Sequence, residues 1–142
     1  MEKEIKLMSA CLLGVKCRYD SKGKPCEKAI ELFKEGSVIP VCPEQLSGFS
    51  TPRTSIEIQE DGRVLDNKGK DVTENLEKGA KETLKIAEMV GAKEFIAKSK
   101  SPSCGFGKTY DGTFSGTLVE RNGFVSDYLN KNGIKIITEE EL

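Results

Sequence analysis

Cysteine is the residue type in this sequence best suited to chemistry, and three of the five cysteines follow short apolar stretches. Cys11, Cys42 and Cys104 stand at or just beyond the ends of these stretches, and Cys17 follows in the loop after Cys11. Thiolates are soft ligands that suit zinc or an iron–sulfur cluster. The chain contains no histidine, which excludes mixed Cys/His zinc sites and His-based catalytic dyads. Each cysteine alone is equally well explained as a small buried residue, so the prediction of a thiolate site depends on all three.

Polar side chains that could assist such a site lie close to the same cysteines. Glu44 stands two residues after Cys42. The loops around Cys17 and Cys104 supply Arg18, Tyr19, Asp20, Lys98, Ser99, Ser101 and Ser103. A carboxylate beside a metal-bound substrate could transfer protons, and a serine hydroxyl could donate a hydrogen bond. The structural alternative is that Glu44 caps a helix or turn and that the serines cap free backbone groups, and position alone leaves both open.

Four apolar stretches are typical of buried strands, and amphipathic stretches separate them. The strands are expected at 5–11, 37–44, 94–99 and 134–138. The helices are expected at 27–36, 72–89 and 124–129. Asp61-Gly62, flanked by alternating residues, predicts a hairpin at 56–65.

This order of elements predicts an α/β fold. We expect a single domain over 1–142, built as a three-layer open sheet of about four mostly parallel strands, with helices on both faces and a small β-hairpin insertion. The carboxyl ends of parallel strands share one edge of a sheet. Cys11, Cys42 and Cys104 are therefore expected to converge on a single crevice.

The charge balance and the cysteine count limit the classes of partner and compartment. The 142 residues include 22 basic and 23 acidic residues, for a formal net charge of -1, which argues against binding of a nucleic acid polymer through its phosphates. The chain lacks a stretch of about 20 apolar residues that would predict a membrane span. Five cysteines are an odd number and cannot all pair in a disulfide framework within the chain. We expect a cytoplasmic protein, a monomer or small homo-oligomer, whose partner is a small molecule.

Five motifs of this chain resemble, in order, those of the DUF523 family: SACLLGVKCRYD, VCPEQLSGFSTPR, DVTENLEKGA, SPSCG and YDGTFSG. Together they cover nearly the whole chain. The family includes a thiouracil desulfidase, so the resemblance implies a 4Fe-4S cluster held by Cys11, Cys42 and Cys104. The fourth iron would be free to bind the sulfur of a thiolated substrate. The segment LSGFSTPRTS departs from the family pattern close to Glu44, which points to a reshaped substrate pocket.

The resemblance also implies roles for side chains around the cluster. Glu44 and Ser101 would be the acid–base and substrate-polarising residues. The substrate pocket would be completed by Cys17, Lys98 and Ser103. The fifth cysteine, Cys26, matches none of the motifs and is expected to be structural.

The implied function is that of an iron–sulfur-dependent desulfidase, a hydrolase- or lyase-type enzyme. It would remove sulfur from a thiolated nucleobase or a related thiocarbonyl compound by non-redox hydrolytic chemistry. Two alternatives from other classes stay open. In the first, a structural or binding module holds zinc in a closed site made by Cys11, Cys17, Cys42 and Cys104. In the second, two of these cysteines form the reversible disulfide of a thiol redox protein, although the chain lacks a CxxC motif.

Overall fold

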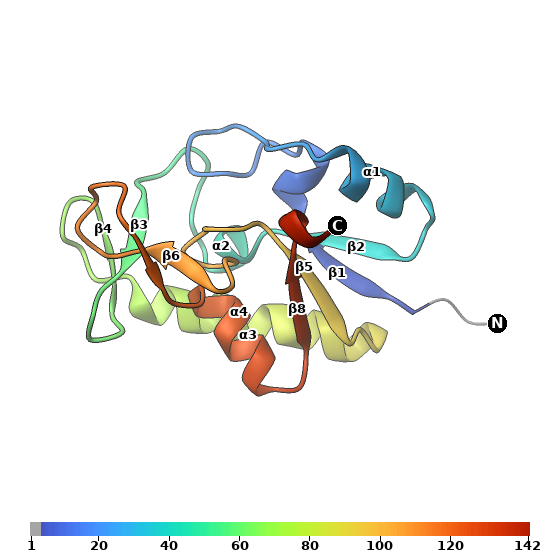
Figure 1. Cartoon of the computed structure of the whole chain (residues 1–142). Coiled ribbons are helices and arrows are strands. Elements are labelled where there is room, and N and C mark those ends of the chain that lie inside the picture. The colour runs from blue at the N-terminus through green and yellow to red at the C-terminus, as the bar shows by residue number, and fades with distance from the viewer. Residues whose placement is uncertain (1–3) are drawn as a thin grey trace.

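A four-stranded parallel sheet forms the centre of the protein in a computed structural model that describes residues 4–142 (Figure 1). Its strands, in spatial order, are β2 (Val38–Val41), β1 (Lys6–Ser9), β5 (Glu94–Ala97) and β8 (Lys135–Thr138). Each strand pairs in parallel with its neighbour, so all four carboxyl ends lie at the same edge. The predicted α/β architecture is confirmed. The single domain over 1–142 stays a prediction, and its first three residues lie outside the described part.

Helices cover both faces of the sheet, as predicted (Figure 1). Leu7 and Met8 of β1 are both fully buried, yet they belong to different core clusters, because successive side chains of a strand point to opposite faces. Leu7 shares its cluster with buried residues of α3 (Thr73–Val90) and α4 (Phe124–Lys131). Met8 shares its cluster with a buried residue of α1 (Glu27–Lys34). Within residues 4–142, no helix has both the length and the apolar character needed to cross a bilayer.

Helix α3 forms where the sequence pattern predicts a helix over 72–89. Leu76 and Ala87 are among its fully buried residues and lie on the face that meets the sheet and its neighbours. Asp71 precedes the helix, and its carboxylate accepts the backbone N–H of Thr73 at 2.9 Å. This bond satisfies one of the free donors at the start of the helix.

A short helix, α2 (Pro43–Leu46), lies directly against α3. Gly79 of α3 makes this approach possible. A Cβ atom at Gly79 would lie 2.0 Å from Oγ of Ser47 and 2.7 Å from the carbonyl oxygen of Pro43. The missing side chain of Gly79 therefore sets the position of α2 relative to the rest of the fold.

Two small antiparallel hairpins lie together at one end of the molecule (Figure 1). The first, β3 (Ile56–Ile58) and β4 (Val64–Asp66), is the hairpin predicted from Asp61-Gly62. The second, β6 (Lys108–Tyr110) and β7 (Leu118–Glu120), lies between the strand expected at 94–99 and the helix expected at 124–129, where no strand is predicted. Its strands are only three residues long and largely exposed, so they carry little apolar alternation.

The first two strands end earlier than their apolar stretches predict. β1 stops at Ser9, and the chain continues as a single turn of 3-10 helix, η1 (Ala10–Leu13). β2 stops at Val41, and α2 begins at Pro43, whose fixed φ suits the first position of a helix. The predicted carboxyl ends of both strands are therefore wrong, and their cysteines lie in the turns that follow the strands.

Candidate active site

Four cysteines line one cavity of about 370 Å³ beside the carboxyl ends of the strands. Cys11 follows β1 within η1, Cys42 follows β2, and Cys104 lies in the loop after β5. These strands are neighbours in the order β2-β1-β5, so strand pairing itself brings the three thiols together. Cys17 reaches the same cavity from the loop after η1. The structure thus brings together the three cysteines expected as ligands and the one expected to line the pocket.

The cavity thiols are largely buried, and three of them are in contact. The thiol of Cys42 donates to the backbone carbonyl of Cys17 at 3.6 Å, and Cys11 packs in the same cluster. Interaction with the Cys11 thiol is the main cause that raises the pKa of Cys17 to about 11, and burial raises the pKa of Cys104 to about 12. The pKa of Cys42 is also raised, by its hydrogen bond with Cys17 and by burial. In the metal-free protein these three thiols keep their protons at neutral pH, so a metal must displace the proton of each thiol that it binds.

The donor set of the cavity suits an iron–sulfur cluster. Four sulfur atoms and no imidazole line it, and cysteine thiolates are the usual ligands of such clusters. Among residues 4–142, no group of three or more His, Cys, Asp or Glu side chains is arranged to hold a metal ion. The ligands of a 4Fe-4S cluster bind different iron atoms, so their sulfurs need not meet at one point. The closed zinc site made by four cysteines gains no support from this arrangement.

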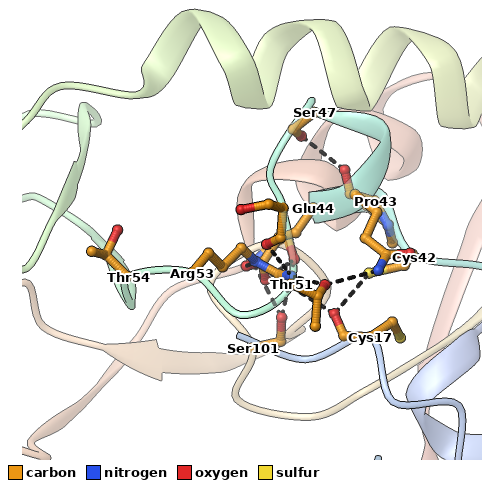
Figure 2. Close-up of polar contacts among 12 residues, drawn as sticks. Cys17, Cys42, Pro43, Glu44, Ser47, Thr51, Arg53, Thr54 and Ser101 are labelled. Atoms are coloured by element: carbon orange, nitrogen blue, oxygen red, sulfur yellow. Dashed lines mark hydrogen bonds and ion pairs between the residues drawn. The ribbon is translucent and has the colours of Figure 1, made fainter. Parts of the chain in front are cut away.

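Glu44 lies in the first turn of α2, and its carboxylate is mostly buried at the cavity wall. Its two oxygens have different partners. Oε1 accepts a hydrogen bond from Nε of Arg53 at 3.3 Å (Figure 2), and Oε2 accepts one from the hydroxyl of Ser103 at 2.8 Å. Helix α2 is held in turn by Ser47, whose hydroxyl donates to the carbonyl of Pro43 at 2.8 Å. The contacts of the carboxylate are therefore to side chains of the cavity and do not cap a helix.

Ser101 and Ser103 form a short chain of hydroxyl groups that leads to Glu44. Their Oγ atoms lie 3.1 Å apart. Because the hydroxyl of Ser103 donates to Glu44, the bond between the two serines is donated by Ser101. Oγ of Ser101 also accepts the backbone N–H groups of Ser103 at 3.3 Å and Cys104 at 3.1 Å, which orders this loop. Of the two serines, Ser103 touches Glu44, and Ser101 lies one hydroxyl further away.

Lys98 and Ser99 also line the cavity, and both contact a carboxylate from the C-terminal segment. Glu139 begins the 3-10 helix η2 (Glu139–Glu141). The carboxylate of Glu139 accepts two hydrogen bonds from Ser99, one from the backbone N–H at 2.5 Å and one from the hydroxyl at 3.0 Å. The ammonium of Lys98 lies 3.7 Å from the same carboxylate and donates to the carbonyl of Ser99 at 2.8 Å. The bonds to Glu139 give Ser99 a structural role, whereas Lys98 brings a partly neutralised charge to the cavity.

Arg53 is a cavity residue that the sequence analysis missed. Its guanidinium contacts Glu44 and the backbone carbonyl of Cys17, the latter at 2.9 Å (Figure 2). The available signal was its place in the motif VCPEQLSGFSTPR, nine residues after Glu44. Tyr110, the first residue of the motif YDGTFSG, also lines the cavity, as do Lys24 and Lys100, which belong to none of the motifs.

Cys26 is not among the residues that line the cavity. It precedes α1 and packs against the core cluster that contains Met8. This position agrees with the structural role expected for it.

Comparisons with known proteins identify relatives along almost the whole chain. A family model described as 2-thiouracil desulfurase matches residues 7–141. The protein YbbK of Bacillus subtilis (strain 168), described as uncharacterized, is 40% identical over 145 aligned residues, which cover 96% of each chain. A solved structure of the 4Fe-4S-dependent thiouracil desulfidase TudS (DUF523Vcz) is 35% identical with a TM-score of 0.93, covering 99% of this chain and 93% of the other. The resemblance to the DUF523 family is thereby confirmed, and this chain belongs to the 2-thiouracil desulfurase family.

Proposed function

We propose that this protein is a desulfidase that uses a 4Fe-4S cluster to remove sulfur from a thiolated nucleobase or a related thiocarbonyl compound. Membership of the 2-thiouracil desulfurase family and the likeness to a 4Fe-4S-dependent thiouracil desulfidase support an enzyme of this class. The observation that carries the proposal is the cavity in which four cysteines meet Glu44. Its volume of about 370 Å³ lies within the range of small-molecule sites, which supports a small thiolated partner.

We assign Cys11, Cys42 and Cys104 as the cluster ligands, because they follow three neighbouring strands and are held by the sheet. Cys17 is left as a thiol of the cavity wall, in contact with two of the ligands. With three protein ligands, a bound 4Fe-4S cluster would keep one iron open as a Lewis acid for the sulfur of a thiocarbonyl group.

Glu44 is the residue that we assign to proton transfer. The net reaction converts C=S and water into C=O and hydrogen sulfide, and no electrons are gained or lost. The attacking water must lose protons as it adds to carbon, and the departing sulfur must gain them. A carboxylate held at the cavity wall can accept a proton from the water and return it to the leaving group.

The two serines would serve the same step from different positions. Ser103 holds one oxygen of Glu44, and Ser101 donates to Ser103. Both line the cavity. We assign Ser103 to the orientation of Glu44 and Ser101 to a hydrogen bond with the substrate, because the Ser101 hydroxyl can turn away from Ser103 towards a bound molecule.

Anaerobic purification and reconstitution test this function. We expect a brown protein with a broad visible absorption band, which releases sulfide and uracil from thiouracil. Glu44→Ala should lose turnover by a factor on the order of 100 or more and keep the absorption band. Glu60→Ala, at an exposed glutamate of the first hairpin, is the matched control and should behave as the wild type. Full turnover in Glu44→Ala would remove Glu44 from the mechanism, and a colourless wild-type protein with stoichiometric zinc would refute the cluster.

A further inference from the structure

We propose that Arg53 is the positioning residue for Glu44, and that it couples the carboxylate to the loop that carries Cys17. The proposal rests on the proposed desulfidase function, since it assigns Arg53 a part in the same reaction. Arg53 does not transfer a proton in this scheme. It determines where the group that transfers the proton lies.

The guanidinium of Arg53 connects two walls of the cavity. Nε donates to Oε1 of Glu44 at 3.3 Å, and Nη2 donates to the backbone carbonyl of Cys17 at 2.9 Å (Figure 2). Nη1 donates to the carbonyl of Ser50 at 3.2 Å and to Oγ1 of Thr51 at 2.8 Å. Only 7% of the Arg53 side chain is exposed. A planar group with bonds on three nitrogens in a buried position has one orientation available, and it imposes that orientation on Glu44.

The backbone of the same residue reinforces this connection. The N–H of Arg53 donates to the carbonyl of Tyr19 at 2.9 Å, so main chain and side chain hold the loop around Cys17 together. Thr51, which accepts from Arg53, also accepts from the side-chain amide of Gln45 in α2 at 2.9 Å. Helix α2, the segment before Arg53 and the loop around Cys17 therefore form one connected unit.

The negative charge of the cavity gives a second reason for a cation next to Glu44. Glu44 shares the cavity with cysteines that become anionic when they bind metal. Like charges in a partly buried site repel each other, and Arg53 is a cation in direct contact with Glu44. Lys98 is a poorer candidate for this role, because its ammonium faces Glu139.

Lysine cannot replace this arrangement. Its ammonium is a compact charge on a flexible stem, whereas the guanidinium contacts Glu44 and Cys17 through different nitrogens at the same time. In Arg53→Lys the positive charge remains, but the connection between the two walls is lost. Comparison of Arg53→Lys with Arg53→Met therefore separates orientation of the carboxylate from compensation of its charge.

Steady-state kinetics of the reconstituted protein provide the first test. We expect Arg53→Lys to lower kcat for sulfide release about 10- to 100-fold and to leave KM within about twofold. Its iron content, visible absorption and Tm should match the wild type. Arg63→Lys is the matched control, because Arg63 is exposed and forms its ion pair with the neighbouring turn residue Asp61 at 2.8 Å, away from the cavity. An unchanged kcat, or a raised KM with unchanged kcat, would overturn the proposal, the latter by making Arg53 a substrate-binding residue.

Crystal structures of the wild type and Arg53→Lys give a readout that does not depend on turnover. We expect the bond between Oε2 of Glu44 and Ser103, 2.8 Å long in the wild type, to be lost or the carboxylate to adopt a second conformer in the variant. An unmoved carboxylate would refute the positioning role. If the wild type released no sulfide, the proposed function would fail, and this comparison would still decide the role of Arg53. Failure of Arg53→Lys to fold would assign Arg53 to stability and overturn the proposal.

Discussion

The hydroxyl of Ser103 lies 2.8 Å from Oε2 of Glu44, although the two residues are 59 positions apart in the chain. Glu44 belongs to α2, which follows β2, and Ser103 lies in the loop that follows β5. Strand β1 separates these two strands in the sheet. The hydrogen bond therefore spans the cavity from one wall to the other and connects the proposed proton-transfer group to the loop that supplies Cys104.

Substitution of Ser103 by alanine removes one of the two hydrogen bonds that orient Glu44. We expect kcat for sulfide release to fall by about one order of magnitude, the effect of losing one hydrogen bond to a charged group. Iron content and visible absorption should stay unchanged. Ser115→Ala, at an exposed hydroxyl in the second hairpin, is the control. A Ser103→Ala enzyme with wild-type kcat would show that the contact plays no part in the reaction.

Substitution of single cysteines distinguishes the proposed cluster ligands from the cysteines that are not expected to bind iron. We expect alanine at Cys11, Cys42 or Cys104 to abolish the visible band and most of the bound iron after anaerobic reconstitution, because a cluster with two protein ligands is poorly held. Cys17→Ala should retain both, and Cys26→Ala is the control outside the cavity. If Cys17→Ala lost its iron as completely as Cys42→Ala, the assignment of three cysteine ligands and one open iron would be contradicted.

Gly79→Ala tests the packing that places Glu44. In an exposed helix, exchange of glycine for alanine stabilises by about 1 kcal/mol. At Gly79 the added methyl group would collide with Ser47 and with the carbonyl of Pro43. We expect a loss of roughly 1–3 kcal/mol in the free energy of unfolding and a lower kcat, because α2 must move. Denaturant titration measures the first effect. Lys78→Ala, at the exposed neighbouring position, should show neither effect, and a stabilised Gly79→Ala would refute this view of the packing.

Asp66 provides a prediction for the pH dependence of stability. The backbone N–H groups of Lys70 and Lys68, both at 2.9 Å from Oδ1, lower the pKa of its carboxyl. The folded protein then binds fewer protons than the unfolded chain in acid. The stabilisation is complete at neutral pH and is lost as the pH falls below about 4, the ordinary range of an aspartate.

Denaturant titration of the metal-free protein at several pH values measures this effect. Asp66→Ala should be less stable than the wild type at pH 7, and the difference should shrink as the pH falls through the acid range. A difference in unfolding free energy that stays constant with pH would contradict the assignment.

The sheet and the convergence of the cysteines could be predicted because they depend on local patterns. The strands of the sheet are short apolar stretches, and Cys11, Cys42 and Cys104 follow three of them. Parallel pairing places the carboxyl ends of such strands at one edge whatever the details of the helices. The position of these residues therefore follows from the order of the elements.

The second hairpin could not be predicted because contacts distant in the sequence hold it. The carboxylate of Glu57 accepts the backbone N–H groups of Gly112 at 3.0 Å and Phe114 at 3.1 Å. Arg121 donates to the carbonyl of Ile58 at 2.6 Å. These bonds join the hairpin to β3, and the exposed strands themselves carry almost no pattern.

Neither helix α2 nor the place of Arg53 in the cavity could be predicted, for a related reason. A helix of one turn has no period to recognise, and its place depends on the absent side chain of Gly79. The partners of Arg53, Glu44 and the carbonyl of Cys17, become neighbours only when two loops have met. The sequence indicates which residues can do chemistry, whereas their mutual orientation depends on the completed fold.

Three neighbouring strands supply the three proposed ligands, and helices α1 and α3 separate these strands along the chain. The three thiols come together only when β2, β1 and β5 have paired in parallel. We therefore expect the proposed cluster to be inserted only after these three strands have paired. If the proposed function holds, insertion of iron and sulfide would be a step that follows synthesis of the chain through β5.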